Sequence, residues 1–265
     1  MNILETKQLT RRFGKFTAVD EISISVQVGE IFGLLGPNGA GKSTTLKMLT
    51  TLLPPTSGMA IVAGFDVARQ AASVRRVIGY VPQLLSADGA LTGYENLLIF
   101  SKLYDLDKKE RDLRIQQSLE LMQLENFAGK LVNTYSGGMI RRLEIAQSML
   151  HRPPILFLDE PTIGLDPVAR NSVWEHIHKL KSQYGTTIML TTHYMEEADS
   201  LCGRVAIMHE GKIAAIGTPA ELKANLGGPD VTLDDVFAHF AGAELEKGGG
   251  YREVTRTRRT ARRMG

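Results

Sequence analysis

A glycine-rich stretch at residues 36–43, GPNGAGKS, carries the residue types that bind a phosphate chain. Glycines let backbone N–H groups point inward at phosphate oxygens, and the helix expected to follow offers the positive end of its dipole. Lys42 would reach the β and γ phosphates, and the Ser43 hydroxyl would ligate Mg²⁺. We therefore expect a triphosphate site, formed by Gly36, Pro37, Asn38, Gly39, Ala40, Gly41, Lys42, Ser43 and Thr44.

Two adjacent carboxylates, Asp159 and Glu160, follow the apolar run ILFL at residues 155–158. If that run is a core strand, it ends at the carboxyl edge of the sheet, where open α/β sheets bind their ligands. Asp159 would then bind the metal, and Glu160 would orient and deprotonate a water in line with the γ-phosphate. The alternatives for Glu160 are a second acidic group that serves only the metal and a cap for the next helix.

A second glycine pair lies far downstream, in YSGGM at residues 135–139. It precedes a run in which Leu143, Ala146 and Leu150 recur at helical spacing. We expect these residues to pack inward, so that the free N–H groups of the first helical turn form a second anion site. One chain would therefore carry two phosphate-binding segments.

Alternating strands and helices must position these segments. The run IFGLLG at residues 31–36 is short and apolar like a core strand, and the helix after it begins at Lys42. Strand character returns at residues 154–160 and 186–193, with a helix between them that ends at Gly185. This alternation predicts a parallel sheet.

The rest of the chain divides into further strands and a helical insertion. Residues 22–28 alternate like a half-buried strand, and strands are also expected over residues 59–67 and 77–83. Residues 90–150 show no strand pattern and carry two amphipathic stretches, LTGYENLLIFSKLYDL and KKERDLRIQQSLELMQL. We therefore expect a helical lobe, over about residues 85–150, inserted into an α/β core.

The composition fits one globular domain with an inserted lobe, since the chain has 265 residues and 43% of them are apolar. No apolar run reaches the roughly 18 residues of a spanning helix, and the start, MNILETKQLTRR, is too polar for a signal peptide. The single cysteine, Cys202, has no partner for a disulfide and fits a reducing cytosol. These features predict a cytosolic protein that does not itself cross a membrane.

The motifs resemble, in order and spacing, those of the ATP-binding cassette ATPases. Besides the segments above, the sequence contains YVPQ at residues 80–83, GLDP at residues 164–167 and TTH at residues 191–193. The resemblance covers about residues 3–217. It is most similar to the ATP-binding subunits of drug-resistance (daunorubicin/multidrug) exporters, because YSGGM replaces the commoner LSGGQ and the chain continues into TLDDVFAHFAG. It implies an α/β fold: a P-loop NTPase core with a mostly parallel sheet, an N-terminal antiparallel β subdomain and an inserted helical lobe.

The resemblance also implies roles for individual residues. Phe13 would stack on the adenine, and Gln83 would sense Mg²⁺ and the membrane partner. His193 would contact the γ-phosphate, and Asp166 would bridge two subunits. The implied catalytic residues are Glu160, His193 and Gln83, and the implied metal ligands are Ser43, Gln83 and Asp159.

The second glycine segment is implied to close over the γ-phosphate held by another subunit, through residues 136–138 (Ser136, Gly137 and Gly138). Met139 and Ile140 depart from the usual polar residues there, which leaves contacts by the backbone and by Ser136. From the residues alone, other interpretations stay open: Phe13 as a core aromatic and His193 as a structural histidine.

The implied C-terminal organisation is a helical extension followed by a basic tail. A capping box at residues 218–221 begins a short helix, and TLDDVFAHFAG places its apolar residues on one helical stripe. After three glycines, the last fifteen residues hold six arginines against one glutamate, although the whole chain has a net charge of only +2. We expect an ATP-binding domain over residues 1–217, a helical extension over residues 218–247 and a disordered tail over residues 248–265.

These roles imply a homodimer that encloses ATP and Mg²⁺ at the cytoplasmic face of a membrane. Hydrolysis would drive a separate permease that moves a drug, lipid or polysaccharide. We expect the tail to be a solvated segment instead of a binding element; if it does bind, its candidate partner is the anionic membrane face. The alternative is a soluble cassette ATPase that acts on nucleic acid or ribosomes. Because there is no coiled-coil insertion and no second cassette, we expect no nucleic-acid partner. A P-loop kinase or GTPase has no use for YSGGM, and import is less favoured than export.

Overall fold

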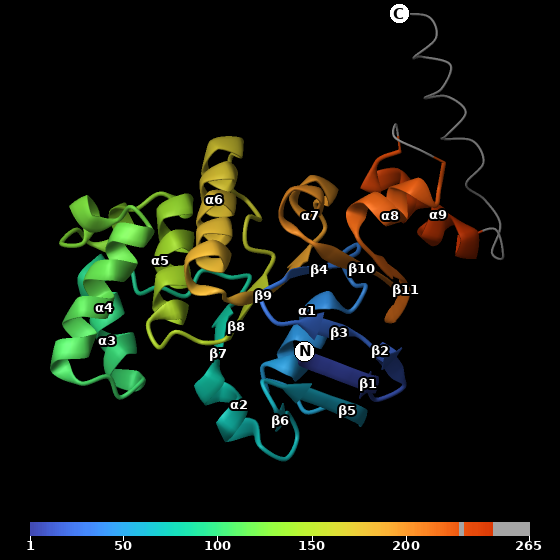
Figure 1. The fold of residues 1–265 in the computed structure, drawn as a ribbon, viewed down its shortest axis with the longest axis horizontal. Coiled ribbons are helices and arrows are strands. Elements are labelled where there is room, and N and C mark those ends of the chain that lie inside the picture. Colours follow the sequence, from blue (N-terminus) through green and yellow to red (C-terminus); the bar gives the residue numbers. More distant parts are fainter. Residues whose placement is uncertain (228–230, 246–265) are drawn as a thin grey trace, which may run out of the picture.

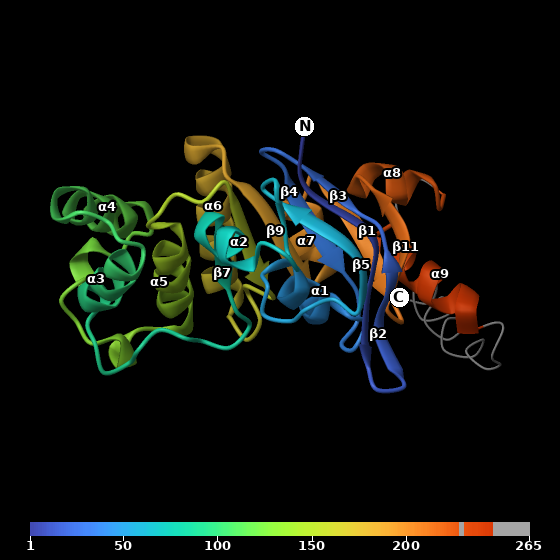
Figure 2. The ribbon, with the colours of Figure 1, turned by 90° about the horizontal axis from the view of Figure 1, so that it is seen from below.

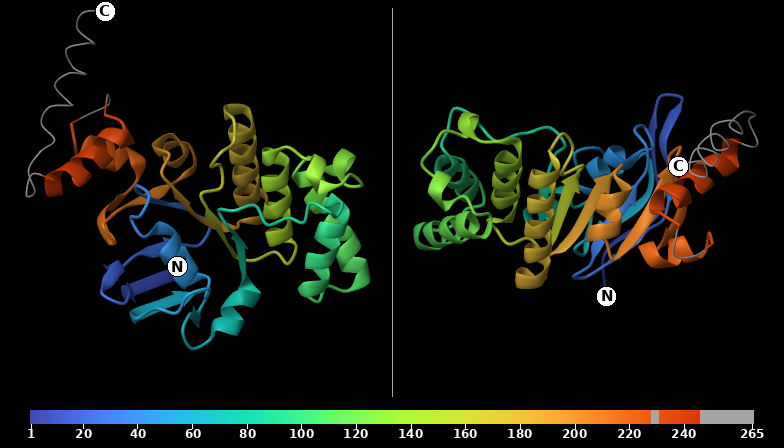
Figure 3. Two further views of the ribbon diagram at one scale, coloured as in Figure 1. Left: turned by 180° about the vertical axis from the view of Figure 1, so that it is seen from behind. Right: turned by 90° about the horizontal axis from the view of Figure 1, so that it is seen from above.

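The computed structural model describes residues 1–227 and 231–245. Figure 1 shows an elongated molecule in which a central sheet separates a helical lobe at one end from two C-terminal helices at the other. The lobe (green) and the C-terminal helices (red) keep these opposite positions in both views of Figure 3. The central sheet therefore positions the other parts of the molecule.

A six-stranded sheet forms this centre. Its strands, in spatial order, are β11 (Lys212–Gly217), β10 (Arg204–His209), β4 (Ile31–Leu35), β9 (Thr187–Thr192), β8 (Ile155–Asp159) and β7 (Ile78–Val81). Neighbours pair in parallel, except that β11 is antiparallel to β10. This confirms the mostly parallel sheet that the alternation of strands and helices predicts.

A second, antiparallel sheet comes from the N-terminal part of the chain. Its strands, in spatial order, are β2 (Phe16–Ile22), β1 (Asn2–Phe13), β5 (Ser57–Val62) and β6 (Phe65–Asp66), with β3 (Ser25–Gln27) paired to β1. The prediction of one strand over residues 22–28 is wrong, because β2 ends at Ile22 and β3 begins at Ser25. At the break, the Thr6 hydroxyl donates to the Ile22 carbonyl and accepts from the Ile24 amide, so a side chain replaces ladder bonds.

Helices pack against both faces of the central sheet. The helices are α1 (Lys42–Leu49), α2 (Ala71–Val77), α3 (Gly93–Leu103), α4 (Lys108–Leu121), α5 (Gly137–Met149), α6 (Pro167–Tyr184), α7 (Met195–Leu201), α8 (Pro219–Ala224) and α9 (Leu233–Leu245). α1 lies between the central sheet and the antiparallel sheet. α6 ends where predicted, at Gly185 with a left-handed φ of 64°. In the part of the chain that the structure describes, no helix has the length and apolar character needed to span a membrane.

Successive residues of the central strands enter two different hydrophobic clusters. Ile31 and Leu35 of β4 belong to the cluster that contains α5, α6 and α7. Phe32 and Leu34 belong to the cluster shared with α1 and the antiparallel sheet, which lies on the opposite side of the central sheet (Figure 2). Burial on both faces explains why β4 is an uninterrupted apolar run in the sequence.

The inserted lobe is helical, as predicted, with short 3₁₀ turns at Glu125–Phe127 and Val132–Thr134. α3 begins at a capping box in which Thr92 and Glu95 exchange hydrogen bonds. α5 packs against α3 and α4 within the lobe and against α6 and β7 of the core. α5 is therefore the element that joins the lobe to the central sheet.

The C-terminal helices follow β11. α8 begins with the predicted capping box, in which Thr218 and Glu221 exchange hydrogen bonds. The apolar stripe predicted for the next helix faces the core from α9 through Leu233, Val236, Phe237 and Phe240. The predicted domain boundaries remain predictions, and the tail at residues 248–265 lies outside the described residues.

Candidate active site

The phosphate-binding segment is a loop between β4 and α1, and its backbone requires glycine at several positions. Gly39 and Gly41 have φ values of 84° and 107°, in the left-handed region that favours glycine. A Cβ on Gly36 would lie 2.2 Å from the carbonyl oxygen of Met208 in β10. The glycine spacing in the sequence therefore follows from backbone conformation and from the close approach of a neighbouring strand.

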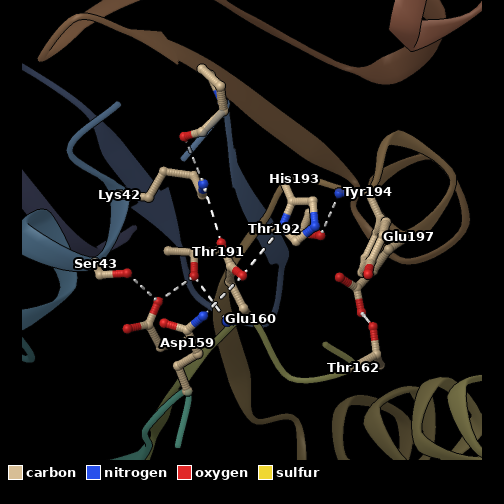
Figure 4. Close-up of polar contacts among 12 residues, drawn as sticks. Lys42, Ser43, Asp159, Glu160, Thr162, Thr191, Thr192, His193, Tyr194 and Glu197 are labelled. Carbon is tan, nitrogen blue, oxygen red and sulfur yellow. Dashed lines mark hydrogen bonds and ion pairs between the residues drawn. The ribbon is translucent and has the colours of Figure 1, made fainter. Parts of the chain in front are cut away.

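Lys42, the first residue of α1, points back into this loop and is 4% exposed. Its Nζ donates to the carbonyl oxygens of Gly36 and Pro37 at 2.8 and 3.1 Å, and it lies 3.3 Å from Glu160 Oε1 (Figure 4). A phosphate entering the loop can take the place of the two carbonyl oxygens, because a hydrogen bond between two charged groups is stronger than one to a neutral acceptor.

Ser43 and Asp159 meet at the carboxyl edge of the central sheet. Ser43 Oγ donates to Asp159 Oδ1 at 2.9 Å, and Thr191 Oγ1 donates to the same oxygen at 2.6 Å. Asp159 and Thr191 are register partners on the adjacent strands β8 and β9, which brings their side chains together. Hydroxyl and carboxylate oxygens suit Mg²⁺, which proteins hold through one or two carboxylates together with substrate phosphates. The residues at this edge therefore fit a Mg²⁺ ion that enters with a nucleotide.

Glu160 lies at the centre of the cluster and is 5% exposed. Its φ of 48° is left-handed, which costs a non-glycine residue about 1 to 3 kcal/mol. Its amide donates to the Thr191 carbonyl oxygen at 3.1 Å, a bond that holds the turn after β8 in this conformation.

Three predicted site residues contact the Glu160 carboxylate. Besides Lys42, His193 Nδ1 lies 3.2 Å from Glu160 Oε2, and Gln83 Nε2 donates to the same oxygen at 3.4 Å. These partners come from the ends of β9 and β7 and from the start of α1. A carboxylate contacted by side chains from three elements is fixed in one place, which is what a proton acceptor for a bound water requires.

Glu160 is not the N-cap of the helix that follows it. The next helix, α6, has Asp166 as its N-cap, and Asp166 Oδ1 accepts from the amides of Val168 and Ala169, both at 3.0 Å. The helix-cap alternative for Glu160 is therefore wrong. Asp166 has a role within its own chain, and the structure does not bring it to the Glu160 cluster.

The second glycine segment also lies apart from that cluster. Ser136 is the exposed N-cap of α5, and its Oγ accepts from the Met139 amide at 3.3 Å. α5 belongs to the hydrophobic cluster on one side of the central sheet and α1 to the cluster on the other side. The predicted inward-facing residues of α5 are buried, and Met139 and Ile140 also pack against the core.

Phe13 ends β1 and is 44% exposed, with the Arg11 guanidinium 4.6 Å from its ring centroid. The core-aromatic interpretation of Phe13 is therefore wrong. An exposed ring at a strand end is free to stack on a flat ligand, and stacking on a base contributes about 1 to 3 kcal/mol.

Two residues near the site escape sequence reasoning. Thr191 fixes Asp159, and its only signal is its place in TTH. Glu197 of α7 is fully buried, and its Oε1 accepts from Thr162 Oγ1 at 2.7 Å (Figure 4). The same oxygen accepts from Trp174 Nε1 at 3.0 Å. Burial raises the pKa of the Glu197 carboxyl group. Glu197 therefore ties the segment after Glu160 to the helix after His193, although an acidic residue in MEEAD resembles a solvated one in sequence.

Residues 19–163, more than half of the chain, match the ABC transporter family. The chain belongs to this family. It is an ABC ATPase, since ATP hydrolysis is the activity of the family's ATP-binding domains, which confirms the prediction from the motifs.

Three relatives have similar sequences over most of this ABC ATPase. The probable multidrug ABC transporter ATP-binding protein YbhF of Escherichia coli (strain K12) is 43% identical over 89% of this chain and 41% of YbhF. The linearmycin resistance ATP-binding protein LnrL of Bacillus subtilis (strain 168) is 41% identical over 86% of this chain and 73% of LnrL. The daunorubicin/doxorubicin resistance ATP-binding protein DrrA of Streptomyces peucetius is 45% identical over 84% of this chain and 68% of DrrA. The chain therefore spans less than half the length of YbhF.

Solved ABC structures confirm the fold. An ATP-binding subunit of an ABC transporter is 29% identical and superposes with a TM-score of 0.80, covering 90% of this chain and 99% of that one. A dimeric ATP-binding cassette in a post-hydrolysis state, bound to ADP and Pi, is 28% identical with a TM-score of 0.71, covering 81% and 98%. The α/β fold expected from the sequence is thus the fold of known ATP-binding cassettes.

Proposed function

We propose that this ABC ATPase is the energy-supplying subunit of an exporter and works as a homodimer that encloses two ATP molecules. The observation that carries the proposal is the placement of Glu160. Its buried carboxylate contacts Lys42, Gln83 and His193 beside the Ser43–Asp159 pair. This arrangement suits the activation of a water in front of a terminal phosphate held by the loop.

In the proposed binding step, the triphosphate occupies the loop at residues 36–44. Lys42 Nζ exchanges the two loop carbonyl oxygens for oxygens of the β and γ phosphates. Bound Mg²⁺ neutralises phosphate charge, and Ser43 and Asp159 are the residues placed to hold it, with Gln83 beside them. Phe13 supplies an exposed ring for the adenine.

In the proposed hydrolytic step, Glu160 accepts a proton from the attacking water. His193, 27% exposed and 3.2 Å from Glu160 Oε2, contacts the γ-phosphate from the end of β9. Gln83 holds the same oxygen of the Glu160 carboxylate, and Lys42 holds the other. Each group has one task, and all three lie at one edge of the sheet.

The second anion site supports the proposed homodimer. Residues 136–138 start α5 with free amides and an exposed Ser136, away from the chain's own phosphate loop. A second copy can present its γ-phosphate there, which completes two sites from two half-sites. The solved dimeric cassette with ADP and Pi supports this assembly.

The names of the relatives support a membrane partner and a cargo class. YbhF, LnrL and DrrA are named for multidrug transport and for resistance to linearmycin and daunorubicin/doxorubicin. We infer that this chain binds a separate permease at the cytoplasmic face of the membrane, as a peripheral subunit. The cargo class we propose is a drug, a lipid or a polysaccharide that the permease exports.

Co-purification of the full chain from membranes tests this proposal. We expect one co-eluting membrane protein with several spanning helices and ATPase activity in the purified complex. Recovery of the chain with nucleic acid or ribosomes, and with no membrane protein, would support a soluble cassette ATPase and overturn the transport proposal.

A further inference from the structure

One face of α5 carries polar residues that are nevertheless buried. Arg141, Glu144, Gln147 and Ser148 are each 5% exposed or less. Buried polar groups require hydrogen-bond partners, and those of Arg141, Glu144 and Ser148 lie in β7 and in the segment after it, whereas Gln147 donates to Asn96 of α3. Ser148 Oγ, for example, donates to the carbonyl oxygen of Tyr80 in β7 at 3.0 Å. The polar face of α5 therefore points at the segment that carries Gln83.

Arg141 and Glu144 form a buried ion pair that holds the backbone of residues 82–87 from both sides. Arg141 donates to the carbonyl oxygens of Pro82 and Gln83, at 2.7 and 2.8 Å, and lies 3.0 Å from Glu144 Oε2. Glu144 Oε1 accepts from the backbone amides of Ser86 and Ala87 and from the Ser86 hydroxyl. The pair thus acts as a clamp: Arg141 holds the start of the segment, and Glu144 holds its end.

The clamped segment has few other attachments. The side chains of residues 83–86 are exposed, and Leu84 and Leu85 are 81% and 51% exposed. Side-chain packing therefore contributes little to fixing this backbone. Gln83 Nε2 nevertheless reaches Glu160 Oε2 at 3.4 Å, which requires the backbone at Gln83 to stay in place.

We infer that Arg141 and Glu144 are positioning residues for Gln83, and that they couple the start of α5 to the Glu160 carboxylate of the same chain. The inference rests on the proposed function, in which the start of α5 binds the nucleotide of the other subunit. A displacement of α5 by that nucleotide moves the clamp and, with it, Gln83. The clamp thus links the half-site at one ATP to the catalytic cluster at the other.

The energetics support a positioning role more than a stabilising one. A buried ion pair recovers in attraction little more than it loses in desolvation, and well-packed apolar residues often replace such a pair at no cost to stability. What apolar residues lack is the ability to hold four backbone groups of residues 82–87 at fixed positions.

A double-mutant cycle on the full chain tests the inference. The two changes are Gln83→Ala and the pair replacement Arg141→Met with Glu144→Leu, which removes both charges together and leaves neither buried alone. ATPase rates and the Kd for ATP are measured for each variant and for their combination. If the pair replacement does not fold, Arg141→Lys takes its place, since it keeps the charge beside Glu144 and loses the fork that reaches two carbonyl oxygens.

We expect the pair replacement to lower kcat by the same factor as Gln83→Ala, to within about twofold, and to leave the Kd for ATP unchanged. The combined variant should be no slower than either alone, because both changes act through Gln83. Arg142→Met is the matched control, since Arg142 lies on the same helix and donates to the Met122 carbonyl oxygen at 2.7 Å, away from the clamp. When Arg142→Met is combined with Gln83→Ala, kcat should fall by the product of the two separate factors.

Independent effects would overturn the inference: the rate of the combined variant would then fall by the product of the two separate factors. ATP-dependent dimerisation of the unaltered chain is measured in parallel. If the chain dimerises with ATP and the two changes act independently on kcat, the positioning role of Arg141 and Glu144 is refuted and the homodimer is not. If the chain hydrolyses ATP without dimerising, the proposed homodimer is refuted.

Discussion

The chain has two glycine-bearing segments in front of helices, and the structure gives them opposite surroundings. The loop before α1 lies among buried charges, since Lys42, Asp159 and Glu160 are 4%, 2% and 5% exposed. The segment before α5 begins with the exposed Ser136, and the side chains nearest its two glycines are apolar. The first segment carries charged groups that can bind phosphate and activate water. The second can bind an anion only through the backbone amides at a helix start and through the Ser136 hydroxyl.

This difference is the one that the proposed homodimer requires, in which one copy supplies the phosphate loop and the other supplies the start of α5. Buried charges cost several kcal/mol of desolvation each unless they are partnered. In the loop they are partnered by one another, as in the Lys42–Glu160 pair, and a triphosphate with Mg²⁺ can take over these partners. An exposed helix start needs no charged partner of its own, because the anion that it binds comes from another molecule.

The largest effect is expected from Glu160→Gln, which removes the proton acceptor and keeps the phosphate cradle. The rate of ATP hydrolysis should fall by about 100-fold or more. ATP binding should persist, and an ATP-stabilised dimer should accumulate, as measured by size-exclusion chromatography. Glu175→Gln, an exposed change on α6, should hydrolyse ATP at the normal rate. Near-normal hydrolysis by Glu160→Gln would remove Glu160 from the base role.

Lys42→Ala should act on binding instead of on chemistry. Loss of a charged donor to the β and γ phosphates costs about 1.5 to 3 kcal/mol, so the affinity for ATP should fall by about 10- to 100-fold. Equilibrium binding of a fluorescent ATP analogue measures this change. Lys47→Ala is the matched control on the exposed side of the same helix. If the affinity of Lys42→Ala for ATP is unchanged, Lys42 does not bind the phosphates, and the two segments do not differ in the way described.

Phe13→Ala should weaken ATP binding less. Loss of a stacking contact at the lower end of its range, about 1 kcal/mol, corresponds to about fivefold in Kd. Phe13→Tyr should keep the affinity, since it keeps the ring. An equal loss for the alanine and tyrosine variants would show that the ring does not stack on the base.

The smallest effect on phosphate binding is expected from His151→Phe. His151 lies just beyond the C-terminal end of α5. Burial lowers the pKa of His151 to about 4, from 6.5, and its ring stacks on Tyr104 at 3.8 Å. The unfolded chain therefore binds this proton first, and stability is lost as pH falls from 6.5 toward 4, by about 1 to 3 kcal/mol. His151→Phe should flatten this part of the pH profile in urea unfolding and leave ATP affinity at pH 7 unchanged. An unaltered profile would contradict the assignment.

Sequence patterns predict the parts of this site that depend on strand ends. Ser43 and Asp159 meet because parallel core strands end at one edge of a sheet, and both follow apolar runs that are plain in the sequence. The same rule correctly brings His193 and Gln83 to Glu160.

Patterns fail where a side chain replaces backbone pairing or where a charge is buried. The hydroxyl of Thr6 interrupts the strand expected over residues 22–28, and alternation alone contains no sign of it. Arg141 and Glu144 have the residue types of a solvated helix face, and their burial depends on backbone groups that are distant in sequence. The proposed homodimer depends on a second copy, so its prediction comes from the family resemblance and not from periodicity within one chain.

The central claim is that residues 136–138 complete the phosphate site of another copy, and subunit mixing tests it directly. Ser136→Arg places a bulky cation at the start of α5, and Ser136→Ala controls for loss of the helix cap, which costs about 1 kcal/mol. A dimer of one Lys42→Ala subunit and one Ser136→Arg subunit has both defects at one composite site and leaves the other site intact.

We predict that Ser136→Arg binds ATP normally as a monomer and fails to dimerise with ATP. Mixed with Lys42→Ala, it should regain ATP-dependent dimerisation, measured by sedimentation, which neither variant shows alone. If Ser136→Arg abolishes ATP binding to the monomer and no mixing ratio restores the dimer, both segments serve one site within one chain, and a phosphate site shared between two copies is contradicted.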